Sequence, residues 1–126
     1  MRIPGYRRIK NLIYRFSGKG DSTFVQNLDG GFSRAPYRAL LYYKTEPFIY
    51  PEVVKDYTHT NLWEITEIVR ILNNFGFVVD IIDRSRVDFM PEDKYDLFIG
   101  LGAGRSGKYF ARYAEALPKA IKVLLA

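Results

Sequence analysis

The residues best placed to do chemistry lie in the segment GLGAGRSGK, which covers residues 100–108. Its glycines match two spacings, G-x-G-x-x-G and G-x-x-x-x-G-K, in which backbone N–H groups at the start of a helix hold a phosphate. The residues of these patterns are Gly102, Gly104, Gly107 and Lys108. Arg105 adds a second cation to the same loop, so one interpretation is a site for a phosphorylated ligand.

Both glycine patterns are incomplete. Tyr109 follows Lys108, whereas a P-loop has serine or threonine at that position to bind magnesium. A dinucleotide site belongs after the first strand of a sheet, and the segment YYKTEPF at the end of the first expected strand contains no glycine. A structural turn between a strand and a helix therefore remains open as the alternative.

A second candidate group lies in YTHTNLWEI, residues 57–65, which holds the only histidine and the only tryptophan of the chain. Asn61 and Glu64 have the spacing of a helix capping box, which explains both without a ligand. Capping does not explain His59, which the pattern places near the carboxyl ends of the strands, where open α/β sheets bind ligands. His59 and Asn61 are therefore candidate substrate contacts, and no catalytic residue is assigned.

The composition excludes several kinds of site. The chain has no cysteine and one histidine, so a zinc-thiolate centre, a thiol nucleophile and a histidine-rich metal site are ruled out. Asp80 and Asp83 are three apart in an expected strand and point to opposite faces, which excludes a pair of catalytic carboxylates. Asp83 ends that strand, where an acid can bind a ribose, and a solvated strand end is the alternative. We expect no metal and no cofactor.

The elements that must position these residues follow from hydrophobic periodicity. The apolar runs RALLYYKT, FVVDIID, YDLFIG and AIKVLLA predict strands, and two amphipathic segments, 65–75 and 108–117, predict helices. Gly76 stands where a helix C-terminus is expected. The order strand, helix, strand, strand, helix, strand predicts an α/β fold with an open, parallel, Rossmann-like sheet over residues 38–126. Because the chain stops in an apolar strand, we expect this domain to be incomplete.

Residues 1–37 have a different character. They carry seven lysines and arginines against two aspartates, while residues 38–126 carry twelve residues of each sign. Ile9, Leu12, Ile13 and Phe16 recur at helical spacing among basic residues, which predicts a basic amphipathic helix, followed by a Gly/Ser-rich linker.

Two environments suit this arm. Residues 6–16 can lie on an anionic membrane surface, or they can pack on the domain or on a partner. The basic charge is confined to the arm and does not accompany the tyrosines elsewhere, so we expect no nucleic-acid partner. There is no signal-peptide pattern and no apolar run long enough to cross a bilayer, so we expect a cytoplasmic protein with possible membrane association.

Together, the segments RALLYYKTEPF, HTNLWEITEIVRILNNFGFVVDIID, KYDLFIGLG and PKAIKVLLA resemble the N-terminal half of a bacterial glycosyltransferase of the GT-B type. The closest match is to enzymes in which a His-x-Asn-x-x-Glu segment opens the first helix, and these positions are His59, Asn61 and Glu64. The resemblance covers residues 38–126. It implies the acceptor-side domain of a two-domain enzyme that transfers a sugar from a nucleotide-sugar.

This resemblance also implies what is missing. The second domain, which mainly holds the nucleotide-sugar in that family, is absent, so the fragment is expected to be inactive alone. In a completed enzyme His59 would contact sugar or acceptor, and the loop with Gly102 and Gly104 would line the cleft. The partners would then be a nucleotide-sugar and a glycan or lipid acceptor. The alternative hypothesis is a non-enzymatic Rossmann-like module that binds a phosphorylated ligand through residues 102–108.

Overall fold

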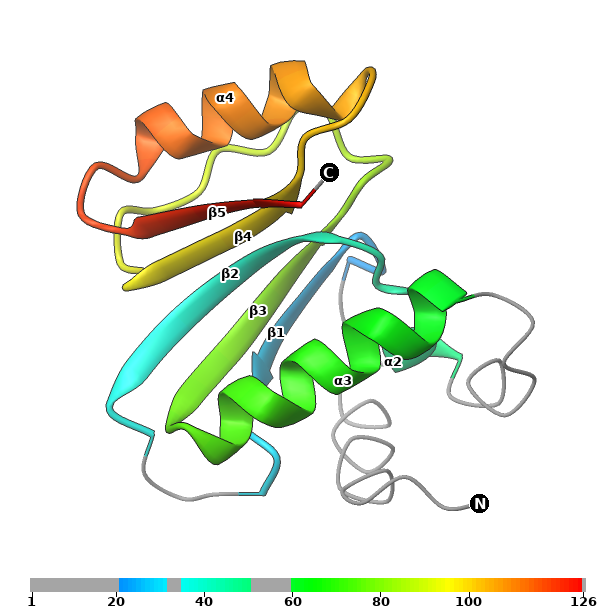
Figure 1. Ribbon diagram of the computed structural model, residues 1–126, viewed down its shortest axis with the longest axis vertical. Coiled ribbons are helices and arrows are strands. Elements are labelled where there is room, and N and C mark those ends of the chain that lie inside the picture. The colour runs from blue at the N-terminus through cyan, green and yellow to red at the C-terminus, as the bar shows by residue number, and fades with distance from the viewer. Residues whose placement is uncertain (1–20, 32–34, 51–59, 126) are drawn as a thin grey trace.

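The computed structural model describes residues 21–31, 35–50 and 60–125, which form an α/β fold with one mixed sheet and three helices. The sheet has five strands in the order β1-β3-β2-β4-β5, and all neighbouring pairs are parallel except β1 with β3 (Figure 1). The elements are β1 (Phe24–Leu28), β2 (Tyr37–Tyr43), α2 (Glu46–Ile49), α3 (Thr60–Asn74), β3 (Phe77–Asp83), β4 (Leu97–Leu101), α4 (Ser106–Ala116) and β5 (Ile121–Leu125).

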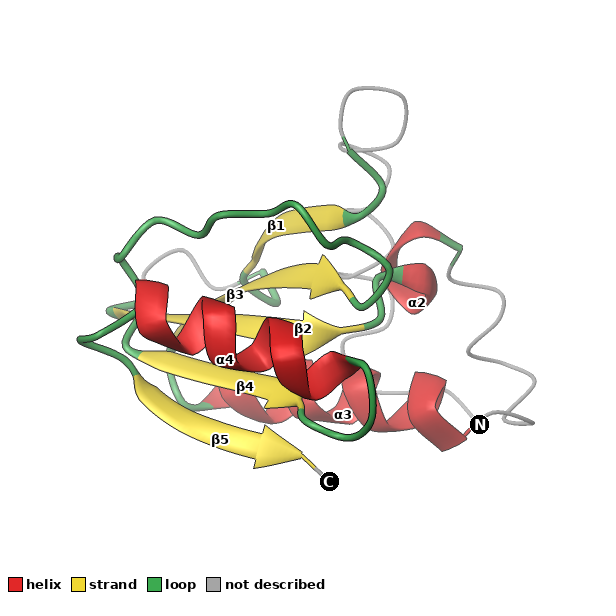
Figure 2. Cartoon of the chain, turned by 90° about the horizontal axis from the view of Figure 1, so that it is seen from above, coloured by secondary structure: helices red, strands yellow, loops and turns green. Residues whose placement is uncertain are grey.

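The central strands are apolar on both faces because helices cover both sides of the sheet. Figure 2 shows α4 on one face and α3 on the other. In β2, Leu41 contributes to the core under α3, and its neighbour Leu40 contributes to the core under α4. Two cores therefore share one sheet, as its β-branched and aromatic strands predict.

The connection between β3 and β4 contains no helix in the structure. It runs over the face that α4 covers, where Phe89 and Tyr95 pack into the same core as Phe98 and Tyr113. Tyr113 donates a hydrogen bond from its hydroxyl to the Arg86 carbonyl oxygen at 2.9 Å, which fixes this connection against α4. The connection thus replaces a helix as a cover for part of the sheet.

The linker interpretation is wrong for residues 24–28, which form the edge strand β1. β1 is antiparallel to β3 and its register shifts between Val25 and Leu28, so the sheet is mixed and not purely parallel. The irregular stretch includes Asn27, whose φ is 61°. Because a shift of this kind breaks strict alternation, the local sequence did not resemble a strand.

A buried carboxylate joins β1 to the rest of the sheet. Asp80 in β3 is fully buried and accepts hydrogen bonds from the Asn27 backbone N–H at 2.8 Å and from the Tyr95 hydroxyl at 2.6 Å. The Arg38 guanidinium lies 3.3 Å from the Asp80 carboxylate. Burial and the adjacent Asp80 charge raise the pKa of Tyr95, so that its hydroxyl remains a donor. Three separate segments therefore converge on one carboxylate.

None of the helices in the described part of the chain is long and apolar enough to cross a membrane. The predicted basic helix at residues 6–16 lies outside the described residues.

Candidate functional site

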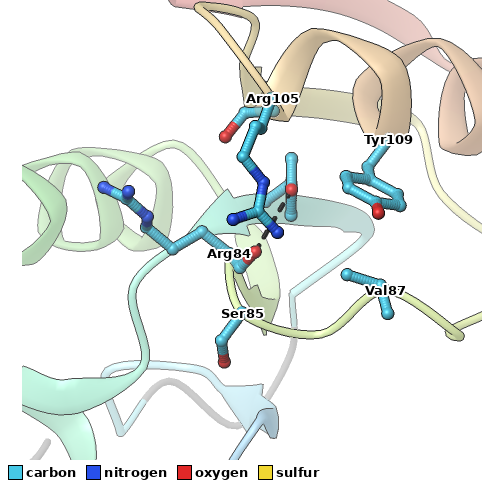
Figure 3. Close-up of a pocket in the computed structure, with 7 residues that line it drawn as sticks. Arg84, Ser85, Val87, Arg105 and Tyr109 are labelled. Atoms are coloured by element: carbon cyan, nitrogen blue, oxygen red, sulfur yellow. Dashed lines mark hydrogen bonds between the residues drawn. The ribbon is translucent and has the colours of Figure 1, made fainter.

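The structure has a pocket of about 300 Å³ at the edge of the sheet where the parallel strands end. Figure 3 shows it between the connection that follows β3 and the start of α4. Its lining consists of Tyr42, Arg84, Ser85, Val87, Arg105, Ser106 and Tyr109.

The topology explains why a pocket forms at this place. The crossover after β2 contains α3 and leads to β3 on one side, while the crossover after β4 contains α4 and leads to β5 on the other side. Chains that leave neighbouring strands in opposite directions open a crevice at their carboxyl ends, and open α/β sheets bind ligands there. The pocket includes Tyr42, near the end of β2, and the residues that precede and begin α4.

One cationic group, the Arg105 guanidinium, lies over this pocket, and hydroxyl-bearing residues line it. The Arg105 guanidinium extends over it toward the backbone of Arg84, whereas the Arg84 side chain runs away from Tyr109 (Figure 3). Within the described ranges, neither arginine takes part in an ion pair. Arg105 immediately precedes α4, whose N-terminus has no side-chain cap. A cation beside a helix N-terminus favours an anion.

Asp83 positions one wall of the pocket. Its carboxylate accepts hydrogen bonds from the Ser85 hydroxyl at 2.6 Å and from the Ser85 N–H at 3.1 Å. The other carboxylate oxygen accepts a bond from the Thr45 N–H at 3.0 Å. Burial alone would raise the pKa of Asp83, but these hydrogen bonds outweigh burial, so the pKa of Asp83 is lowered. Asp83 is thus neither a free ribose ligand nor a simply solvated strand end.

We expect Asp83→Asn to destabilise the protein at pH 7 by about 1–3 kcal/mol, because the amide cannot accept all the bonds that the carboxylate accepts. The native pKa is below the unfolded value, so this stabilisation is full above about pH 4, the unfolded pKa, and decreases as the pH falls through the folded pKa. Urea unfolding is measured at several pH values from 7 to 3. The free energy of unfolding should decrease less steeply with falling pH in the variant than in the unaltered chain. Identical pH slopes for the two proteins would contradict this role of Asp83.

Tyr42 forms the floor of the pocket. Its ring is buried, and its hydroxyl donates a hydrogen bond to the Arg84 carbonyl oxygen at 3.3 Å. Burial raises the pKa of Tyr42, so the hydroxyl stays protonated near neutral pH. Arg84, the first residue after β3, has a second hydrogen bond: its N–H donates to the Tyr43 carbonyl oxygen at 2.7 Å. The backbone on this side of the pocket is therefore fixed.

The glycines of the loop are largely explained by packing. A Cβ added to Gly102 would lie 1.9 Å from the Leu124 side chain, and one added to Gly107 would lie 2.8 Å from the Gly102 carbonyl oxygen. Gly104 has φ 57°, which favours glycine, and faces open space. Because Gly107 has no side chain, the start of α4 can lie close to the end of β4. A glycine allows the same close approach in a purely structural turn and in a dinucleotide-binding turn.

The predicted phosphate residues do not line the pocket. Gly102, Gly104, Gly107 and Lys108 are absent from its walls, whereas Arg105 and Ser106 from the same loop belong to them. The N–H groups of Ser106 and Gly107 donate to the Ala103 and Gly104 carbonyl oxygens, both at 3.2 Å. The exposed Lys108 ammonium lies 5.6 Å from the Tyr109 ring centroid. The loop thus contributes side chains to the pocket, and these two N–H groups are engaged within the turn.

The other predicted site residues are described only in part. His59 lies outside the described residues, and Asn61 lies in the first turn of α3, with only its backbone described. Glu64, expected in a capping box, accepts a hydrogen bond from the Tyr43 hydroxyl at 2.9 Å. This bond and burial, which is the larger cause, raise the pKa of Tyr43 to about 12. The roles of His59 and Asn61 remain predictions.

Sequence reasoning missed most of the lining residues. Ser85 and Arg84 directly follow Asp83, and a polar pair after a buried strand is a sign that could have identified them. Tyr42 and Tyr109 lie 67 positions apart in the sequence, and only the fold shows that both line one pocket. The described residues contain no group of three or more histidine, cysteine, aspartate or glutamate side chains that could hold a metal ion.

Comparison of the chain with protein-family models, with curated proteins and with solved structures finds no match.

Proposed function

We propose that this domain binds a small phosphorylated ligand in the pocket at the carboxyl ends of β2 and β4. The observation that carries the proposal is the Arg105 guanidinium, which extends over the pocket without an ion-pair partner among the described residues. An arginine without an ion-pair partner among the described residues suits a phosphate, because the planar guanidinium can donate several charge-assisted hydrogen bonds to the phosphate oxygens.

The volume of the pocket and its other lining residues limit the size and the chemistry of the ligand. A volume of about 300 Å³ is at the lower end of the range for small-molecule sites, which begins at about 300 Å³. Val87 and the Tyr109 ring supply an apolar side opposite Arg84 (Figure 3). A sugar phosphate or a nucleoside monophosphate fits these dimensions better than a dinucleotide does.

Calorimetric titration with a nucleoside monophosphate tests the proposal. We expect Arg105→Gln to weaken binding by about tenfold to a hundredfold, which corresponds to the loss of charged hydrogen bonds. Lys119→Gln removes an equal charge from an exposed position outside the pocket and is expected to leave the affinity unchanged. No binding by the unaltered chain would contradict the proposal. Loss of binding in Lys108→Ala but not in Arg105→Gln would place the phosphate beside Lys108, outside this pocket.

A second candidate function is that of the acceptor-side domain of a GT-B type glycosyltransferase. The observation in its favour is that α3 and α4 both begin at the carboxyl edge of the sheet, so that Asn61, Gly102 and Gly104 share that edge. In this proposal the chain acts with a nucleotide-sugar domain. Its acceptor would depend on His59 but not on Arg105. Titration of a sugar acceptor that is abolished in His59→Ala and retained in Arg105→Gln would favour the transferase over the phosphate module.

A further inference from the structure

An apolar surface forms one side of the pocket, and a bound phosphate alone does not account for it. Val87 and the Tyr109 ring make up this surface, on the side away from Arg84 (Figure 3). Val87 is 41% exposed, and Tyr109 is half-buried against the core under α4. Apolar side chains do not stabilise a phosphate, so these two residues indicate a second, apolar part of the ligand.

Arg112 holds the Tyr109 ring beside Val87. The carbon atom of the Arg112 guanidinium lies 5.6 Å from the Tyr109 ring centroid, within the range of a cation–π contact. The same guanidinium donates a hydrogen bond to the Val87 carbonyl oxygen at 3.3 Å. Arg112 follows Tyr109 by three residues in α4, so it supports the ring from the C-terminal side of the helix.

Helix geometry directs the other side of the ring toward the pocket. Side chains in a helix lean toward its N-terminus, so the Tyr109 ring lies over the turn that contains Arg105 and Ser106. Both of these residues line the pocket, whereas the exposed Lys108 does not. Arg105 and Tyr109 are about 6 Å apart along the helix axis. One small ligand can therefore contact the guanidinium with its phosphate and the ring with its other end.

The lining residues limit which ligands can use the apolar surface. Among the described residues, no carboxylate and no side-chain amide lines the pocket. The Ser85 hydroxyl already donates to Asp83, and the Tyr42 hydroxyl donates to a backbone carbonyl oxygen. A sugar would place hydroxyl groups against this surface with few side-chain acceptors, and a hydroxyl buried without a partner costs free energy. The face of an aromatic base needs no hydrogen bond and can stack on a tyrosine ring.

We propose that the ligand of this pocket is a nucleoside monophosphate whose base stacks on the Tyr109 ring while its phosphate binds Arg105. This inference rests on the phosphate site proposed above and adds the class of the ligand to it. Tyr109 is then the residue that distinguishes a nucleotide from a sugar phosphate, and Val87 contacts the same base.

Calorimetric titrations with adenosine monophosphate and with ribose 5-phosphate test the inference, because the two ligands share the ribose and the phosphate and differ in the base. We expect the unaltered chain to bind adenosine monophosphate at least about tenfold more tightly, an effect within the range for stacking of one base on an aromatic side chain. Tyr109→Leu is expected to abolish this preference and to leave the affinity for ribose 5-phosphate unchanged. Tyr109→Phe keeps the ring and is expected to retain the preference.

Tyr37→Leu is the matched control, because Tyr37 is 48% exposed at the start of β2, whereas the pocket lies where the strands end. It is expected to leave both affinities unchanged, and Arg105→Gln is expected to weaken both ligands. Circular dichroism shows whether each variant is folded. Equal affinities of the unaltered chain for the two ligands would overturn the inference and leave the phosphate site in place. A preference for adenosine monophosphate that persists in Tyr109→Leu would also overturn it. If neither ligand bound, the proposed function itself would be wrong.

Discussion

Replacement of Asp80 by alanine is expected to lower the free energy of unfolding by about 3–5 kcal/mol, because it removes the buried carboxylate that pairs with the partly exposed Arg38 and accepts two further hydrogen bonds. Asp80 is fully buried, and its carboxylate accepts bonds from Arg38, Asn27 and Tyr95. Alanine would leave the Tyr95 hydroxyl and the Asn27 N–H without this acceptor. The measurement is urea unfolding followed by circular dichroism at pH 7.

Two further variants separate the charge from the hydrogen bonds of Asp80. Asp80→Asn keeps the shape and one acceptor, so it is expected to cost less than alanine. Tyr95→Phe removes only the donor at 2.6 Å from the carboxylate and is expected to cost about 1–3 kcal/mol. If Asp80→Ala unfolded at the same urea concentration as the unaltered chain, the buried network would not contribute to stability.

Replacement of Phe98 by alanine is the second change with a large expected effect, about 3–5 kcal/mol, because it leaves a cavity in the core under α4. Phe98 has no exposed surface. Its ring stacks on Phe110 with centroids 5.0 Å apart and meets Tyr113 edge to face at 6.5 Å. Loss of these contacts removes apolar burial and two aromatic pairs together.

Met90→Ala is the matched control for Phe98→Ala. Met90 lies in the connection over the same face and is 67% exposed, so its truncation is expected to change stability by less than about 0.5 kcal/mol. Both variants are compared in one urea series. Equal losses of stability in the two variants would show that the aromatic cluster does not hold α4 on the sheet.

The regular elements could be predicted from the sequence because their periodicity is strong. FVVDIID corresponds residue for residue to β3, and the helix expected at 108–117 is α4, Ser106–Ala116. The strand expected at 95–100 is β4, Leu97–Leu101. Each of these segments has a local pattern that burial on one or both faces imposes, so neighbouring residues contain most of the necessary information.

The features that the sequence did not reveal depend on distant contacts. β1 owes its place to Asp80, and the pocket combines residues from β2, from the connection after β3 and from α4. No short stretch of the sequence contains all of these residues. The glycine loop illustrates the difference, because its spacing suggested a phosphate cradle, whereas Gly102 and Gly107 are needed for close packing against Leu124 and the backbone.

The pairing of β1 with β3 has a consequence for synthesis of the chain. Asn27 leaves the ribosome 53 residues ahead of Asp80, the group that holds it in place. At about 5–20 residues per second, β1 waits about 3–10 s for its partner. Its polar residues Gln26 and Asn27 keep this waiting strand from being a purely apolar edge. Of the described strands β1 is made first, yet it cannot pair until β3 has been made.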